Sequence, residues 1–391
     1  MRNTLKALCL LAFAAISCGQ RQESIENITD RIFSYAVQKY TDMDKDIPDG
    51  YGLDSSTPDG KLRIFPISSY AWTIGFYPGT LWYIYEYTGD ENIREMAVKR
   101  TEDLEPVKYL TSHHDIGFMM NCSYGNALRL SGKESYEEVL ITSARSLSTR
   151  FNDTVGCIQS WGRTEKWPYP VIIDNMMNLE LMMNAYKLSG EQRFADIANS
   201  HAKVTAKNHF RDNYSSYHVV AYDPETGKVV QKNTHQGLAD ESSWARGQAW
   251  ALYGYTMMYK ETGDEEYLAL AENIASYILS RLPEDMVPYW DYDSPDIPDT
   301  YYESSAAAIE ASALIDLYRF TKTKKYLSAA EKTIRTLASD KFLAKEDEYS
   351  GFLLKHSNGS VPSNGQVDVP LTYTDYYFLE ALLRYRNLAK K

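Results

Sequence analysis

The chain has 391 residues, of which 53 are acidic and 41 basic, so its formal net charge is −12. An acidic surface repels nucleic acid, and no basic run offsets it, so a nucleic-acid-binding role is excluded. Four cysteines are too few for a disulfide scaffold, whereas 32 tyrosines and 7 tryptophans suit either a large core or a cleft that stacks on sugar rings.

The first 17 residues resemble a bacterial lipoprotein signal peptide. Arg2 and Lys6 precede an apolar run that is too short to span a bilayer, and a cysteine, Cys18, follows it. We expect residues 1–17 to be removed, Cys18 to carry lipid and residues 18–24 to form a short tether. An ordinary secretory signal is the alternative. Both readings predict export, and the first predicts a periplasmic protein that touches a bacterial membrane only through its lipid.

Two cysteines, Cys122 and Cys157, remain in the mature chain after Cys18. They are able to form a disulfide in an exported protein, but nothing in their spacing requires it. No segment after the signal peptide is long and apolar enough to suggest a membrane span.

A short phrase recurs along the chain and predicts a series of helical hairpins. Each copy contains the end of one helix, a Ser/Thr-Gly stop, an acidic restart and an aromatic residue that enters the next helix. The last copy has Lys322 where the others have glycine. The copies begin at Tyr85, Leu128, Tyr186, Tyr259 and Tyr318.

An apolar helix precedes each phrase and an amphipathic helix follows it. With an opening helix near residues 24–40 and a closing helix near 374–387, this makes about twelve helices. One strand hairpin is expected within residues 217–233. We therefore predict an all-α fold, an (α/α)6 barrel of about six helical hairpins that forms a single domain over residues 25–391. An open α-solenoid is the less favoured alternative, because helices that are apolar nearly all round need enclosure.

In such a barrel the inner helices begin at one end, and two aspartates lie at such starts. Asp115 precedes IGFMMN and Asp174 precedes NMMNLELMM. Long loops rich in Trp, Tyr, Pro and Asp lead to the same end, as functional loops do. Each aspartate is either a helix N-cap or part of a carboxylate pair of the kind that cleaves glycosides. If the two are close, each hinders ionisation of the other, and one retains a proton.

The segment SSWARGQAW places Arg246 and Trp250 four residues apart, on one helix face. Arg246 is expected to clamp a substrate carboxylate or to form a buried ion pair with an aspartate, and Trp250 to stack on a sugar ring or to fill the core. His218 and Gln236 lie on the expected hairpin and suit sugar hydroxyls, although such residues in loops are often only solvated. His113 and His114 lack a second cluster of His or Cys that would complete a metal site, so no metal is predicted.

Taken together, these segments resemble glycoside hydrolase family 88, the unsaturated glucuronyl hydrolases. The resemblance covers most of the mature chain, and SSWARGQAW joined to THQG is its most specific part. The matching segments are WTIGFYPG with Trp72, HHDIGF with Asp115, IIDNMMN with Asp174, YHVVAYDPETG with His218, THQG with Gln236, SSWARGQAW with Arg246 and Trp250, ESSAAAI with Ser304, and DYYFLEALLRY.

The resemblance implies removal of the 4,5-unsaturated uronic acid that polysaccharide lyases leave at the non-reducing end of their products. The implied reaction is hydration of the C4=C5 vinyl ether, with Asp174 as general acid and base and Asp115 tuning it. Trp72, Trp161 and Trp250 would stack on the substrate, while the remaining matched polar residues (His218, Gln236 and Arg246) orient the sugar and its carboxylate. No cofactor or metal is needed, and the expected partner is an unsaturated acidic oligosaccharide, from a glycosaminoglycan.

The family also implies that a loop near the C-terminus contacts the second sugar. In this chain it starts at Leu353, and Lys355, His356, Ser357, Ser360 and Ser363 either contact a sulfate there or form a polar surface loop. Two other functions stay open: an unsaturated galacturonyl or rhamnogalacturonyl hydrolase on the same barrel, and a non-catalytic lipid-anchored glycan-binding protein. The oligomeric state is not predicted.

Overall fold

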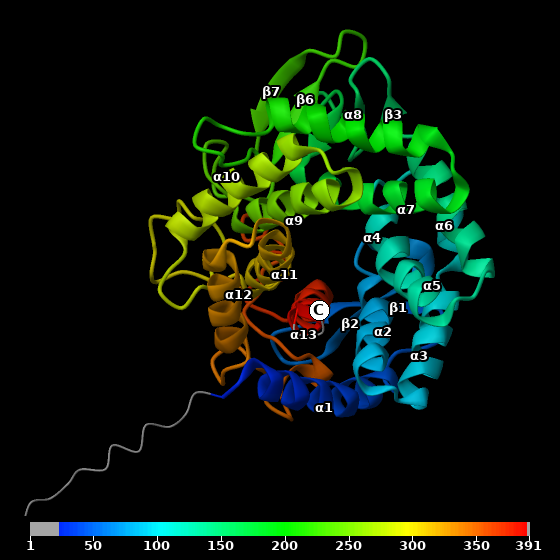
Figure 1. Ribbon diagram of the computed structural model, residues 1–391, viewed down its shortest axis with the longest axis vertical. Coiled ribbons are helices and arrows are strands. Elements are labelled where there is room, and N and C mark those ends of the chain that lie inside the picture. Colours follow the sequence, from blue (N-terminus) through cyan, green and yellow to red (C-terminus); the bar gives the residue numbers. More distant parts are fainter. Residues whose placement is uncertain (1–22, 389–391) are drawn as a thin grey trace, which may run out of the picture.

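The computed structural model describes residues 23–388, and in this part of the chain two rings of helices surround a common axis (Figure 1). The outer ring consists of α1 (Ile25–Asp44), α3 (Glu91–Glu102), α6 (Ser135–Ser148), α8 (Gln192–Asn208), α10 (Glu265–Arg281) and α12 (Lys324–Leu337). The inner ring consists of α2 (Phe76–Thr88), α4 (Ile116–Met120) with α5 (Asn126–Ser131), α7 (Leu179–Ser189), α9 (Ala245–Thr262), α11 (Ser304–Thr321) and α13 (Thr372–Leu388).

Two inner positions are not plain α-helix. A π-helical turn, η3 (Asn121–Gly125), joins α4 to α5, and a 3₁₀ turn, η4 (Ile173–Asn178), leads into α7. Three further 3₁₀ turns lie in connecting segments: η1 (Ile67–Ser69), η2 (Glu105–Tyr109) and η5 (Tyr349–Gly351). Both π turns and short 3₁₀ stretches often mark functional positions.

The inner ring closes on itself, because α13 packs between α11 and α2. The outer helix α1 lies against α2, α12 and α13, so the first and last helices of the chain meet (Figure 1). This closure confirms the predicted (α/α)6 barrel and excludes the open solenoid.

Burial explains which helices line the inside. Residues 304–317 of α11 are all buried, and so are residues 245–258 of α9, as expected for helices that are covered on every side. The outer helix α12 instead buries one face, from Tyr326 to Leu337. Small residues let the inner helices approach closely: a Cβ on Gly254 would lie 2.6 Å from the Met176 Cβ.

The repeated phrase forms the tight turn between each inner helix and the outer helix after it. Four of these turns end with a glycine in the left-handed region, for example Gly89 with φ 67°. The Lys322 of the last copy takes the same conformation with φ 58°, which a non-glycine residue adopts at some cost.

The expected strand hairpin is present as β6 (Val219–Tyr222) and β7 (Val229–Asn233), and β5 (Pro170–Ile172) pairs with β6. Sequence reasoning missed a second hairpin, β1 (Tyr51–Ser56) with β2 (Leu62–Pro66), and the two-residue pair β3 (Phe151–Asn152) and β4 (Cys157–Ile158). Strand β1 is buried at five successive positions, so it lacks the alternation that reveals a half-buried strand.

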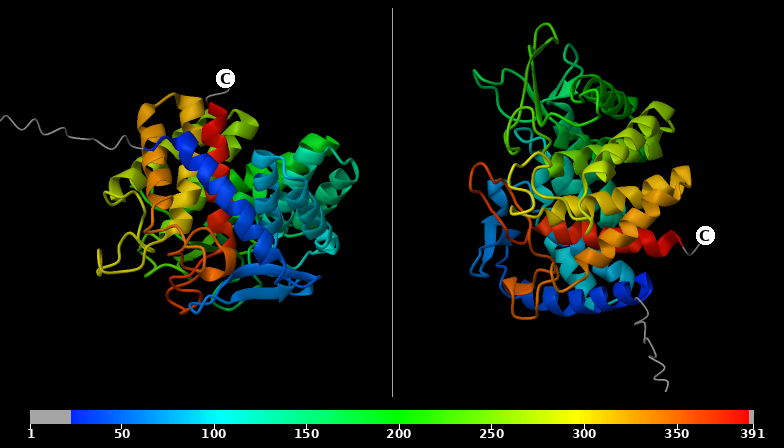
Figure 2. Two further views of the ribbon diagram at one scale, coloured as in Figure 1. Left: turned by 90° about the horizontal axis from the view of Figure 1, so that it is seen from below. Right: turned by 90° about the vertical axis from the view of Figure 1, so that its left-hand side faces the viewer.

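The two ends of the barrel differ, and Figure 2 shows them from the side. We call the end where the inner helices begin the mouth, and the end where they finish the floor. The long loops and the β1–β2 hairpin gather at the mouth, whereas the C-terminus of α13 lies at the floor (Figure 2). The mouth is therefore the end at which the predicted site residues should meet.

Two further expectations concern cysteines and membranes. Cys122 and Cys157 are both buried free thiols, so they do not form a disulfide with each other. Within residues 23–388, no helix has the length and apolarity needed to cross a bilayer. The signal peptide and the lipidated Cys18 lie outside the described residues, so those predictions stay untested.

Candidate active site

Asp115 stands at the N-cap position of α4, but its side chain makes no capping hydrogen bond. Its Oδ1 instead accepts a hydrogen bond of 3.0 Å from Nδ2 of Asn178. Asp174 lies inside η4, whose N-cap residue is Ile172. Neither carboxylate is used to cap a helix, so the alternative reading of both residues as N-caps fails.

Asn178 links the segments that carry the two aspartates. It follows Asp174 by one helical turn, and besides binding Asp115 its Oδ1 accepts the backbone N–H of Phe118 at 2.9 Å. The two segments lie in close contact, since a Cβ on Gly117 would come within 2.4 Å of the same Oδ1. Sequence reasoning missed Asn178, although it is the last residue of the quoted segment IIDNMMN that contains Asp174.

A buried histidine completes this link. His114 Nδ1 lies 3.3 Å from Oδ1 of Asn175 and 3.3 Å from Oδ1 of Asp115. Burial lowers the pKa of His114 to about 4, so the ring is neutral at physiological pH. The Nδ1 proton then faces two acceptor oxygens, which fixes the orientation of the Asp115 carboxylate.

Asp174 has the electrostatic properties of an acid that works near neutral pH. Burial raises its pKa to about 7, the positive charge of Arg246 opposes the rise, and the negative charge of Asp115 adds to it. The side chains of Asp174 and Asp115 are only 13% and 11% exposed, and Oδ2 of Asp174 is itself buried. Oδ2 of Asp174 has no hydrogen-bond partner among the described residues.

His218 faces this bare oxygen as a neutral donor. Its Nδ1 accepts the backbone N–H groups of His235 and Gln236 at 3.1 and 3.2 Å, which places the ring proton on Nε2. Burial lowers the pKa of His218 well below its usual value. Nε2 lies 3.6 Å from Oδ2 of Asp174 and also lacks a partner in the described part of the chain.

Arg246 is buried in an ion pair, as one of its two expected roles required, but the partner is Glu303 at 3.3 Å and not an aspartate. Its guanidinium also donates to the carbonyl oxygens of Asn358 and Gly359 and lies over the Trp244 ring at 4.5 Å. Only Nε stays without a partner among residues 23–388. Arg246 therefore positions the C-terminal loop and keeps one N–H free. Sequence reasoning missed Glu303 and Trp244, although they are residues of the quoted segments ESSAAAI and SSWARGQAW.

The three predicted aromatic residues do not share one environment. Trp250 is fully buried between Phe118 and Tyr377, with its indole N–H unpaired within the described chain. Trp72 and Trp161 are partly exposed. Trp161 stands edge-on to His218, with ring centroids 5.7 Å apart.

Loops from three parts of the chain meet around these residues. Gln236 donates to the carbonyl of Gly359 at 2.8 Å, the same carbonyl that Arg246 binds, so it also holds the C-terminal loop. Ser360 has a buried Oγ with no partner in the described chain, and the exposed Ser363 donates to the Ser360 carbonyl at 3.3 Å.

The expected cations of the C-terminal loop are already paired. Lys355 forms an ion pair with Glu348 at 3.2 Å, and His356 lies 2.7 Å from Asp368. Ser357 is buried and bonds to the hydroxyl of Ser304. A sulfate contact from Lys355 would therefore compete with its ion pair to Glu348.

The three consecutive residues His113, His114 and Asp115 have ligand atoms close enough to share a metal ion. However, His113 Nδ1 accepts the backbone N–H of Asp115, and His114 Nδ1 serves the Asn175 and Asp115 oxygens. The two Nδ1 atoms are therefore engaged within the protein, whereas Nε2 of His114 is buried without a partner in the described chain. The absence of a metal stays a prediction.

Comparison with known proteins supplies the decisive observation. The family model described as Glycosyl Hydrolase Family 88 matches residues 53–385. This chain belongs to glycosyl hydrolase family 88. The expected family is thereby confirmed, and with it the expectation that this family 88 chain is an enzyme, a glycoside hydrolase.

Individual relatives agree. An unsaturated glucuronyl hydrolase of Formosa agariphila is 43% identical over 377 residues, which are 95% of this chain and 92% of that protein. An unsaturated chondroitin disaccharide hydrolase of Streptococcus pyogenes is 35% identical and covers 86% of this chain and 87% of its own. A crystal structure of an unsaturated glucuronyl hydrolase specific for heparin has a TM-score of 0.91 at 46% identity, and the match covers 94% of this chain and 99% of that one.

These similarities confirm the predicted activity, unsaturated glucuronyl hydrolysis, and argue against the non-catalytic glycan-binding protein. They do not test the individual site residues. The structure brings Asp115, Asp174, His218, Arg246 and Trp250 together, but their roles stay predictions.

Proposed function

We propose that this family 88 hydrolase uses Asp174 as the single acid and base that hydrates the C4=C5 bond of a terminal unsaturated uronic acid. The observation that carries the proposal is the bare Oδ2 of Asp174, on a carboxyl group whose pKa is raised to about 7. A general acid works best when its pKa lies near the working pH, so the group is able both to give and to take a proton.

The reaction follows from these properties. The carboxyl of Asp174 gives its proton to C4, which forms a C4–H bond from the π electrons and leaves positive charge on C5 and the ring oxygen. A water oxygen bonds to C5 while Asp174, now ionised, takes a proton from that water. The resulting hemiketal opens, the next sugar is released, and Asp174 is protonated again.

The neighbours of Asp174 support the charges that develop. Asp115, held by Asn178 and His114, places a negative charge near the cationic ring. The Nε2–H of His218 and the Nε–H of Arg246 are free to donate to the substrate. Unpaired buried donors are rare in folded proteins, and a substrate that accepts from them satisfies both.

We propose further that the preferred substrates are heparin-derived disaccharides. The support is the 46% identity to the structure of a heparin-specific unsaturated glucuronyl hydrolase, against 35% to the Streptococcus pyogenes chondroitin disaccharide hydrolase. Loss of ultraviolet absorbance, which reports destruction of the C4=C5 bond, should be at least tenfold faster for heparin than for chondroitin disaccharides. Equal rates, or a faster reaction with chondroitin or with unsaturated galacturonyl substrates, would reject this preference.

Export and lipid anchoring at Cys18 also remain proposals, supported by the lipoprotein-like order of the first 18 residues. In bacterial cells that express the full chain, the protein should partition with membranes and lose that partition in a Cys18→Ser variant. Mass spectrometry of the mature N-terminus checks this directly, since an unmodified residue other than Cys18 at the start would contradict it.

A further inference from the structure

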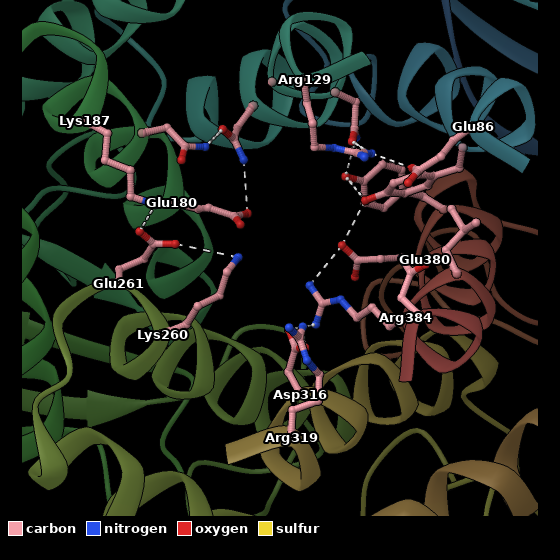
Figure 3. Close-up of a pocket in the computed structure, with 18 residues that line it drawn as sticks. Glu86, Arg129, Glu180, Lys187, Lys260, Glu261, Asp316, Arg319, Glu380 and Arg384 are labelled. Carbon is pink, nitrogen blue, oxygen red and sulfur yellow. Dashed lines mark hydrogen bonds and ion pairs between the residues drawn. The ribbon is translucent and has the colours of Figure 1, made fainter. Parts of the chain in front are cut away.

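The floor of the barrel contains a cavity of about 350 Å³ that the proposed reaction does not use (Figure 3). Its walls come from the ends of the inner helices, far from the mouth. Arg246 and Lys260 lie on the same helix α9, and 14 residues of α-helix separate them by about 21 Å. The rim is open to solvent, since the Lys187 and Lys260 side chains are about half exposed.

The walls are polar, with as many acidic as basic side chains. The acidic ones are Glu86, Glu180, Glu261, Asp316 and Glu380, and the basic ones are Arg129, Lys187, Lys260, Arg319 and Arg384. Formal charges therefore cancel. However, the inner helices end here, and the carbonyl groups at helix C-termini add partial negative charge. This partial charge favours a positive ligand beside any carboxylate of the wall that has no cation of its own.

Four of the five carboxylates are already matched by a cation. Glu86 pairs with Arg129, Glu261 with Lys187, Asp316 with Arg319, and Glu380 with Arg384. These pairs are arranged around the cavity wall (Figure 3). The fifth cation, Lys260, lies 3.6 Å from the same Glu261, so two lysines share one carboxylate and one acidic group is left without an ion pair of its own.

The remaining group is Glu180. No Lys or Arg of the described chain lies within ion-pairing distance of it, and its Oε2 only accepts from Nδ2 of Asn121 at 3.0 Å. Asn121 is held in turn by Nδ2 of Asn184 at 2.7 Å. The Glu180 side chain points into the cavity (Figure 3). Burial raises the pKa of Glu180, and the positive charge of Lys260 opposes this rise, as that of a bound ammonium group would.

We infer that this floor cavity binds a small polyhydroxylated amine of monosaccharide size, an amino sugar, with its ammonium group on Glu180. The volume lies within the range of small-ligand sites. The amide and charged side chains of the wall offer donors and acceptors for hydroxyl groups, and Leu383 is the one aliphatic residue among those that line it. The inference does not depend on the proposed roles of the mouth residues.

The experiment is calorimetric titration of the full protein with three probes: glucosamine, N-acetylglucosamine and glucose. At about pH 6 the free amine is protonated. We expect one site for glucosamine and at least tenfold weaker binding of the two neutral sugars. Equal binding of the three sugars, or no binding of glucosamine, would overturn the inference. Potassium chloride should weaken glucosamine binding no more than the same concentration of a salt with a bulky cation does. A stronger effect of potassium would indicate a simple ion site and would also overturn the inference.

Two variants locate the binding. Glu180→Gln should bind glucosamine at least tenfold more weakly than the wild type. Its hydrolase activity and its unfolding midpoint should equal those of the wild type. Asp174→Asn, which changes the mouth, should bind glucosamine as the wild type does. If Asp174→Asn removes the binding, or Glu180→Gln retains it, glucosamine binds elsewhere and the inference fails. The Asp174→Asn variant tests the proposed hydrolysis separately. Failure of the proposed function is therefore distinguishable from failure of the inferred amino-sugar site.

Discussion

The mouth and the floor of the barrel are built from the same inner helices, yet Asp174 at the mouth and Glu380 at the floor are carboxylates in opposite surroundings. At the floor, Glu380 accepts from the hydroxyls of Tyr83, Tyr253 and Ser312 and pairs with Arg384. At the mouth, one oxygen of Asp174 has no partner in the described chain. A carboxylate with all its partners stabilises the fold, whereas one without them is available to a substrate.

Helix direction explains part of this difference. Helix N-termini favour negative charge and C-termini favour positive charge. Basic residues accordingly occupy the last turns of inner helices at the floor, for example Lys187 in α7, Lys260 in α9 and Arg319 in α11. The cations that satisfy carboxylates are thus concentrated at the end away from the chemistry.

The largest expected effect follows from removing the acid. Asp174→Asn should reduce kcat by about 10²–10⁴-fold, because proton transfer in the transition state is lost. Binding of the disaccharide should persist. The rate of absorbance loss and a calorimetric titration check the two halves, and a decrease of less than about tenfold would remove Asp174 from this role.

The same substitution, Asp174→Asn, should also change the stability of the fold in a pH-dependent way. The folded-state pKa of about 7 lies above the usual value of 3.8, so the unfolded state loses this proton first, and stability falls as the pH rises from about 3.8 to about 7 and is constant above it. Asp174→Asn should therefore unfold at a temperature at least as high as the wild type at pH 8, and the gain should vanish at pH 4. A less stable variant at pH 8 would contradict the pKa assignment.

The next largest effect belongs to the floor. Glu380→Ala should lower the free energy of unfolding by about 2–3 kcal/mol, because three buried hydroxyls lose an acceptor and Arg384 loses one of its two ion pairs. Glu86→Ala is the matched control: its pair with Arg129 is more exposed, so the loss should stay below about 1 kcal/mol. Denaturant unfolding measures both, and kcat should be unchanged within about twofold. A large loss of kcat in Glu380→Ala would contradict the assignment of a purely structural role to this carboxylate at the floor.

A smaller effect is expected for Asn178→Ala, which frees the Asp115 carboxylate from its hydrogen bond. We expect kcat/KM to fall about tenfold, the equivalent of one hydrogen bond to a charged group. Asn184→Ala is the control on the same helical segment, because Asn184 bonds to Asn121 at the floor. The two variants are compared by initial rates, and equal losses in both would show that Asn178 acts only through stability.

The smallest expected effect is a displacement along the pH axis. The alkaline limb of kcat/KM should report loss of the Asp174 proton near pH 7. Because the negative charge of Asp115 raises the pKa of Asp174, Asp115→Asn should move this limb to lower pH. A limb that stays in place or moves to higher pH would mean that the two carboxylates do not interact.

Much of the fold was predictable because the repeat is local. Turn glycines, acidic restarts and apolar runs indicate hairpins, and six hairpins with apolar inner members close into a barrel. The β1–β2 hairpin was missed because its pairing partners are defined by buried contacts and not by an alternating pattern. Sequence patterns therefore predicted the helices better than the loops between them.

The candidate site was predictable where a motif contains the functional side chain, as with Asp115 and Asp174. It was not predictable where the role depends on a distant partner. The sequence offered Lys355 as a free cation, but Glu348 pairs with it. It offered Arg246 as a clamp for substrate or as half of a buried ion pair, and only the fold shows that the pair forms and that its partner is Glu303.

The central claim is that Asp174 holds a proton at neutral pH, and infrared spectroscopy of the carboxyl groups tests it most directly. The difference between the wild type and Asp174→Asn isolates this group from other buried carboxyls, including Asp375, whose pKa is also raised to about 7. We predict a protonated-carboxyl band that disappears with a midpoint at about pH 7. A band that is already absent at pH 5 would contradict the account.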